Sequence, residues 1–222
     1  MLGEYDPFFS SVVLLVHGNG SNGGTSFQDS SSYARAAAVV GAVTTATDAA
    51  AFLGSSIKFL ETVAANYVEF NAASFLGSTT SPYTVECFVD LSAVTGSNKD
   101  ANFLKLTSGA STFLELGTLF TNTFVSRNTA GGYQYSVPDY LARTHMAVVR
   151  NSSGVTAWYI DGVQQASVGQ MTNSDFDKIR IGSSPSSPSS ASDGGFISEI
   201  RVSKVARYTG SFTPPTASFP NS

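Results

Sequence analysis

The chain has 222 residues, of which 42% are hydrophobic, 12% aromatic and only 13% charged, and its formal net charge is -4. A chain of this length can form one large β domain, so a single core is expected. The lysines and arginines are scattered along the chain, so nucleic acid is not an expected partner. No basic residue precedes the short apolar run 12–16, so we expect neither a signal peptide nor membrane insertion.

Apolar and polar residues alternate with period two along most of the chain, which indicates β-strands. Strands are expected at 12–16, 55–59, 67–70, 84–91, 103–107, 112–116, 123–127, 133–137, 144–150, 155–160, 163–168, 178–181 and 196–203. The Ala-rich stretch 34–51 is ambiguous between helix and strand. So many strands exceed what one open sheet usually carries, so two packed sheets are expected.

The segment 144–168 gives the clearest pattern, a meander of three strands. Asp161-Gly162 joins the last two, and this pair favours a tight hairpin because both residues tolerate positive φ. Cys87 alternates with Val85 and Val89 and is expected in the core as a small apolar residue. As the chain's one cysteine it forms no intrachain disulfide, which suits folding in a reducing cytoplasm.

The chain divides into three parts by composition. An extended amino-terminal arm is expected at 1–11, a β domain at 12–207 and an extended, proline-containing tail at 208–222. The low-complexity stretch 183–195 joins two strands rather than two domains, because alternation resumes directly after it. Both ends are expected to lie either on the β domain or on a partner.

Several strings match one family in order and spacing. They include LLVHGNG at 14–20, YTVECFV at 83–89, WYIDGV at 158–163, GFISEIRV at 195–202 and VARYTGSFTPP at 205–215. The chain thus resembles the concanavalin A-like lectin/glucanase superfamily, specifically the laminin-G-like jelly rolls of bacteriophage virion and tail proteins. The resemblance implies an all-β, antiparallel two-sheet jelly-roll sandwich, with 12–207 as the laminin-G-like domain.

Catalysis is not expected. The superfamily includes glycoside hydrolases, but Glu86 and Asp90 on one strand lie about 13 Å apart, beyond the spacing of catalytic carboxylate pairs. The sequence also lacks the closely spaced acidic residues that would make it resemble the glucanases of this superfamily. His17 and His145 are expected to be structural, because no nucleophile-elbow motif accompanies them.

Two Asx-rich segments allow two interpretations, a calcium site or a self-contained turn. Asn173, Asp175 and Asp177 present alternating oxygen ligands of the kind that Ca²⁺ takes, and Asn19, Asn22 and Asp29 form a second such group. Short Asx-rich turns more often satisfy their own backbone, which is the favoured reading. No other cofactor is expected.

Sugar binding on such a fold uses exposed aromatic rings as stacking surfaces. The available platforms are Trp158, Tyr133, Tyr135 and Phe88, together with Tyr140. Each is equally suited to a place in the core.

The resemblance implies a non-enzymatic bacteriophage virion structural protein, namely a capsid decoration, head-fibre or tail accessory protein. Its partners are then other capsid or tail proteins, with a homo-oligomer left open, and its place is the virion after synthesis in the host cytoplasm. The alternative is a carbohydrate-binding adhesin that binds host-surface glycans.

Overall fold

A computed structural model describes residues 5–49, 52–59, 66–78, 80–92, 102–109, 111–119, 123–128, 131–136, 143–170, 175–183 and 195–222. The description is of the backbone alone at 102, 111–113, 117–119, 123–128, 131–136, 166–170 and 183. The expected loop at 183–195 falls almost wholly outside these ranges.

One layer is an eight-stranded antiparallel sheet, called the first sheet below. Its spatial order is β13-β12-β11-β6-β15-β4-β3, and β1 pairs with β15 beside β4. Its strands are β1 (Val12–Val16), β3 (Thr44–Ala46), β4 (Ser56–Phe59), β6 (Tyr83–Asp90), β11 (Thr144–Arg150), β12 (Val155–Ile160), β13 (Val163–Gln170) and β15 (Gly195–Ser203). A 3-10 turn, η1 (Phe9–Ser11), precedes β1.

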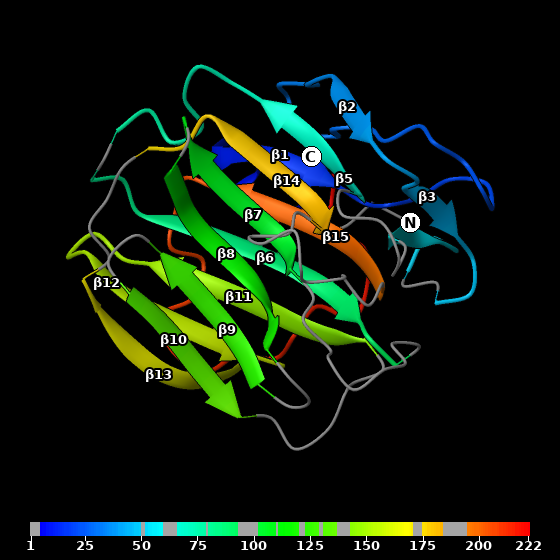
Figure 1. Cartoon of the computed structure of the whole chain (residues 1–222). Helices are drawn as coiled ribbons and strands as arrows, with labels where there is room; N and C mark the ends of the chain where they lie inside the picture. Colours follow the sequence, from blue (N-terminus) through cyan, green and yellow to red (C-terminus); the bar gives the residue numbers. More distant parts are fainter. Residues whose placement is uncertain are drawn as a thin grey trace.

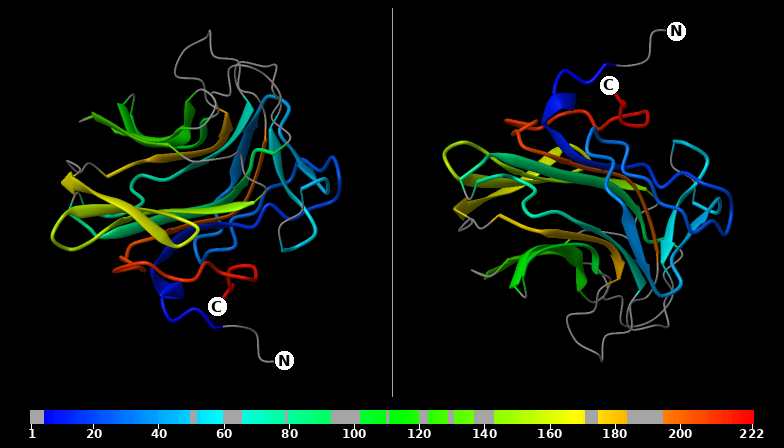
Figure 2. Two further views of the ribbon diagram at one scale, coloured as in Figure 1. Left: turned by 90° about the horizontal axis from the view of Figure 1, so that it is seen from below. Right: turned by 90° about the horizontal axis from the view of Figure 1, so that it is seen from above.

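The other layer is a seven-stranded antiparallel sheet, the second sheet, in the order β10-β9-β8-β7-β14-β5-β2. Its strands are β2 (Ala37–Val40), β5 (Asn66–Asn71), β7 (Asn102–Ser108), β8 (Ser111–Leu119), β9 (Thr123–Asn128), β10 (Gly131–Ser136) and β14 (Lys178–Ser183). The two sheets stack face to face (Figures 1 and 2), which confirms the expected sandwich.

The core between the sheets follows from the alternation. Val85, Cys87 and Val89 of β6 point into it, as do Ile179 and Ile181 of β14. Burial of such side chains contributes roughly 25 cal/mol per Å² of apolar surface removed from water, so the strands are fixed in this register.

Each expected strand overlaps an observed one, and the meander is confirmed. Asp161 and Gly162 have φ of 46° and 75°, the positive values that a tight hairpin turn requires. The ambiguous stretch 34–51 contains the two short edge strands β2 and β3, which sequence alternation did not resolve. Within the described residues, no helix is long and apolar enough to cross a bilayer.

The outer face of the first sheet is also buried. Every residue of β11 is buried, and so is every residue of β15 except Gly195. Both chain ends contribute to the cover, and they lie on the same side of the molecule (Figure 2). Tyr208 and Phe212 pack on Ala147, Val149 and Tyr159, so the carboxyl tail lies on its own sandwich.

Candidate functional site

A carboxylate lies in the middle of the covered face. Glu86 on β6 is opposite Arg201 on β15 and is fully buried. Arg201 Nε donates to Glu86 Oε1 at 2.9 Å, and the Tyr208 hydroxyl donates to Oε2 at 2.7 Å. His145 Nε2 lies 3.2 Å from the same Oε2. Burial raises the pKa of Glu86, but the Arg201 charge and the His145 contact outweigh it and set the pKa at about 2.

Asp6, from the amino-terminal segment, lies next to this carboxylate. Arg207 holds it in a two-pronged pair, with Nη1 to Oδ1 at 3.0 Å and Nη2 to Oδ2 at 2.8 Å. Arg201 Nη1 also donates to Oδ2 at 3.2 Å, and the Phe8 amide donates to Oδ1 at 2.9 Å. These bonds, chiefly from Arg207, keep the pKa of Asp6 low although burial raises it.

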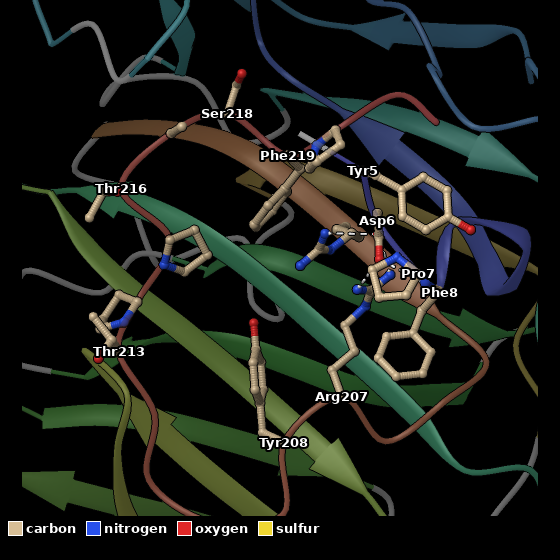
Figure 3. A pocket seen from close by; sticks show the side chains of 15 residues that line it. Tyr5, Asp6, Pro7, Phe8, Arg207, Tyr208, Thr213, Thr216, Ser218 and Phe219 are labelled. Carbon is tan, nitrogen blue, oxygen red and sulfur yellow. Dashed lines mark hydrogen bonds and ion pairs between the residues drawn. The ribbon is translucent and has the colours of Figure 1, made fainter. Parts of the chain in front are cut away.

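A groove of about 450 Å³ opens above these charges. One wall is the amino-terminal segment and the other is the carboxyl-terminal tail (Figure 3). It is lined by Tyr5, Asp6, Pro7, Phe8, Arg201, Arg207, Tyr208, Thr213, Pro214, Pro215, Thr216, Ala217, Ser218, Phe219 and Pro220. The side chains of Tyr5 and Phe8 are 75% and 41% exposed, so this wall offers aromatic rings to a ligand.

The floor of the groove contains guanidinium N–H groups that do not bind other described residues. The guanidinium of Arg201 stacks on the Phe219 ring, with 3.7 Å from Cζ to the ring centre. Its Nε and Nη1 atoms bind Glu86 and Asp6, and the hydrogen bonds of the described residues include none from Nη2. The groove therefore combines aromatic rings, proline rings and uncommitted N–H groups.

The tail wall is anchored by a second buried pair. His17 Nδ1 lies 2.9 Å from Glu199 Oε2, and its Nε2 lies 2.7 Å from Asn221 Oδ1. The same Glu199 oxygen accepts the Phe219 amide at 2.9 Å. Glu199 has φ of 50° within the irregular part of β15. Burial lowers the pKa of His17, but its bond to Glu199 outweighs this and the pKa is raised.

Two of the expected sugar platforms are buried, which corrects the sequence interpretation. Trp158 is 1% exposed and belongs to the core between the sheets. Phe88 is 5% exposed and is covered by Phe52 and His145, at ring-centre distances of 5.1 and 4.8 Å. Neither ring offers a face to a ligand, because both faces of the first sheet are covered. Tyr133 and Tyr135 lie on β10, but their side chains fall outside the description, as does Tyr140.

The expected metal cluster is only partly described. Asn173 lies outside the described ranges. Asp175 Oδ1 accepts the amides of Leu76 and Phe176 at 2.8 and 2.9 Å. Asp177 Oδ2 accepts the Gly109 amide at 3.1 Å. These carboxylates thus bind backbone amides, and the described residues contain no group of three His, Cys, Asp or Glu side chains suited to a metal. The preference for Asx turns over a calcium site stays a prediction.

Asp29, of the second expected metal group, has a structural role. Its Oδ1 accepts the amides of Leu15 and Ser31 at 3.1 and 2.9 Å, and its Oδ2 accepts the Arg35 amide at 3.0 Å. These bonds hold the chain beside β1.

The groups weighed for catalysis also have structural roles. Asp90 Oδ1 accepts the amide and the hydroxyl of Ser92. His145 is fully buried on Glu86, and His17 is 4% exposed. Cys87 is buried and its pKa is raised, first by burial and then by Glu86, so its thiol is unreactive.

Sequence reasoning missed the residues that form the groove. Asp6, Arg201 and Arg207 come from the two ends of the chain, and 195 positions separate Asp6 from Arg201. One local signal was present. Glu86 interrupts the apolar strand 83–89, and a charge at such a position indicates a buried ionic partner.

Comparisons with known proteins agree with this fold. Residues 62–209 match the family described as the concanavalin A-like lectin/glucanases superfamily. A search of curated proteins gave no match.

Solved structures of toxin binding domains are similar in fold. A botulinum neurotoxin type C structure has 14% identity and a TM-score of 0.67, covering 90% of this chain and 49% of its own. The binding domain of botulinum neurotoxin DC, in complex with rat synaptotagmin II, has 13% identity and a TM-score of 0.68, with coverage of 90% and 50%. The binding domain of Paraclostridial Mosquitocidal Protein 1 has 11% identity and a TM-score of 0.65, with coverage of 90% and 50%. The chain thus spans about half the length of these structures, and the likeness shows the fold.

Proposed function

Because the chain belongs to the concanavalin A-like lectin/glucanase superfamily, we propose that it is a carbohydrate-binding domain whose ligand occupies the groove between its two ends. The observation that carries the proposal is the pairing of exposed aromatic rings with uncommitted guanidinium N–H groups in one groove. Carbohydrate sites have this composition, because sugars present flat C–H faces and hydroxyl oxygens together.

The solved relatives support the same class of function. The botulinum neurotoxin type C structure is described as a cell-entry protein that depends on two ganglioside molecules, and another relative as a toxin binding domain in complex with SialylT. These proteins are related to this chain through fold only, so their ligands indicate a class of function rather than a specific sugar.

Each wall of the groove has a role in this proposal. Tyr5 and Phe8 stack against the C–H face of a sugar ring. Arg201 Nη2 donates to a ring or hydroxyl oxygen from below. Thr213 and Thr216, exposed on the tail, donate and accept at the rim.

The test is binding of the purified chain to a glycan array, followed by calorimetric titration of the strongest ligand. The variants Tyr5→Ala and Phe8→Ala each remove one ring from the groove, and each is expected to weaken binding about tenfold, within the range measured for aromatic contacts. Tyr33→Ala is the matched control, because Tyr33 is also exposed, at 49%, but lies outside the groove.

Two results contradict the proposal. The first is an array without any ligand. The second is a ligand whose affinity falls equally in Tyr33→Ala and in the groove variants.

Virion assembly, which the sequence resemblance favours, remains a prediction that none of the structural observations supports. Adhesion to a host glycan is the function with structural support. We also propose that the chain has no glycosidase activity, because Glu86 is buried and stays ionised, which does not suit a general acid. Release of new reducing ends from polysaccharides would contradict this.

A further inference from the structure

Resting on the proposed function, we infer that Asp6 makes the groove select uncharged over acidic glycans, by occupying the guanidinium groups that would otherwise bind a ligand carboxylate. Asp6 is thus a specificity-determining residue of the groove. The inference depends on how Asp6 is bound, on the local charge balance and on the donors that remain free.

Asp6 has no capacity to accept further hydrogen bonds. A carboxylate offers about four lone-pair sites, two on each oxygen. Oδ1 accepts from the Phe8 amide and from Arg207 Nη1, and Oδ2 accepts from Arg207 Nη2 and Arg201 Nη1. The carboxylate therefore does not bind ligand hydroxyl groups, and its effect on a ligand is electrostatic.

Arg207 is correspondingly occupied. Its Nη1 and Nη2 atoms face Asp6 in the planar, two-pronged geometry by which arginine recognises carboxylates, and its Nε donates to the Ser203 hydroxyl at 2.8 Å. A ligand carboxylate forms the same two-pronged pair with Arg207 Nη1 and Nη2 only after displacing Asp6. Asp6 is held in place by its own backbone, since its amide donates to the Ser222 carbonyl at 2.9 Å.

The charges beneath the groove cancel. Asp6, Arg201 and Arg207 are the charged residues among those that line it, and Glu86 lies directly below, paired with Arg201. Two carboxylates thus face two guanidinium groups. The whole chain has a net charge of -4. An acidic ligand therefore gains no net attraction and approaches the Asp6 carboxylate.

An uncharged sugar is not repelled by the Asp6 carboxylate. Arg201 Nη2 lies at the floor without an acceptor among the described residues, and a hydroxyl, ring or acetamido oxygen is a suitable acceptor for it. The exposed rings of Tyr5 and Phe8 bind the sugar face regardless of its charge. The groove therefore favours neutral ligands.

The experiment compares matched pairs of glycans. Each pair consists of a neutral oligosaccharide and the same oligosaccharide extended by an acidic sugar, such as lactose and sialyllactose. Dissociation constants are measured for the wild-type chain and for Asp6→Asn, which keeps the size of the side chain and removes its charge. The control is Asp48→Asn, which removes the same charge from an exposed pair with Lys58 outside the groove.

We expect the wild-type chain and Asp48→Asn to bind the neutral member more tightly. In Asp6→Asn the ratio of the two dissociation constants should shift toward the acidic member by on the order of tenfold, because the guanidinium charges are then uncovered. An unchanged ratio in a folded Asp6→Asn protein, or an equal shift in Asp48→Asn, overturns the inference and leaves the proposed function standing.

A second measurement covers the case in which Asp6→Asn does not fold. Wild-type affinity for the neutral glycans should stay within about twofold as NaCl is raised from 50 to 300 mM, because no net charge is neutralised. Tight binding of acidic glycans that weakens steeply with salt overturns the inference. Failure of both glycan classes to bind the wild-type chain refutes the proposed function, and this inference with it.

Discussion

Replacing Glu86 with glutamine tests whether the buried charges hold the chain ends on the first sheet. The variant keeps the size of the side chain and removes the Glu86 charge from the Arg201 guanidinium, which is 6% exposed and then has only Asp6 as a carboxylate partner among the described residues. The difference between the pKa of about 2 and the ordinary value of 4.5 corresponds to about 3 kcal/mol. Breaking a buried ion pair from one side generally costs about 3–5 kcal/mol. Glu86→Gln is therefore expected to lose about 3 kcal/mol at neutral pH.

The assay is urea unfolding of both proteins at about pH 7 and about pH 3.5. The folded-state pKa of Glu86 is lowered, so its contribution is complete above 4.5 and is lost as the pH falls toward 2. The wild-type advantage should thus shrink by on the order of 1 kcal/mol at the lower pH. All other carboxylates are common to both proteins and cancel in the difference. An advantage below about 1 kcal/mol at pH 7, or one that does not shrink in acid, would refute this reasoning.

Three further outcomes are expected. His17→Gln should lose more stability at about pH 5.5 than at about pH 8.5, because the pKa of His17 is raised by Glu199 and its contribution disappears as the pH rises through that pKa; a loss that grows with pH in urea unfolding contradicts this. Gly162→Ala should lower the melting temperature far more than Gly54→Ala. Both glycines have a positive φ, 75° at Gly162 and 82° at Gly54, so the backbone strain is similar, but of the two only Gly162 would place a Cβ 1.9 Å from a carbonyl oxygen of the tail. Equal losses in the two variants would contradict the packing of the tail on this turn. Excess Ca²⁺ and a chelator should give the same melting temperature, because Asp175 binds backbone amides, and a clear rise in Ca²⁺ would contradict that role.

The sandwich could be predicted from sequence because the patterns that specify its strands and hairpins are local. Alternation marks each strand of the core, and Asp161-Gly162 marks the hairpin. The pattern is less informative at β2, where an Ala-rich segment forms an edge strand whose Val39 and Val40 are partly exposed. Such strands are defined by pairing with β5 rather than by their own composition.

The site could not be predicted in the same way. Alternation indicates that Phe88 and Val89 point to opposite faces, but not that the tail covers the outer face and contacts Phe88 through Phe219. Trp158 was an equally ambiguous case, because a large aromatic ring suits a core and a sugar platform alike. The groove depends on Asp6 meeting Arg207, a contact between the two ends of the chain that no local pattern reveals.

The most direct test of the central claim is a crystal structure of the chain with the strongest ligand from the glycan array. The account predicts a sugar ring against Tyr5 and Phe8, with one of its oxygens within hydrogen-bond distance of Arg201 Nη2. A sugar bound instead on the second sheet or on its loops, with the groove between the chain ends empty, would contradict it.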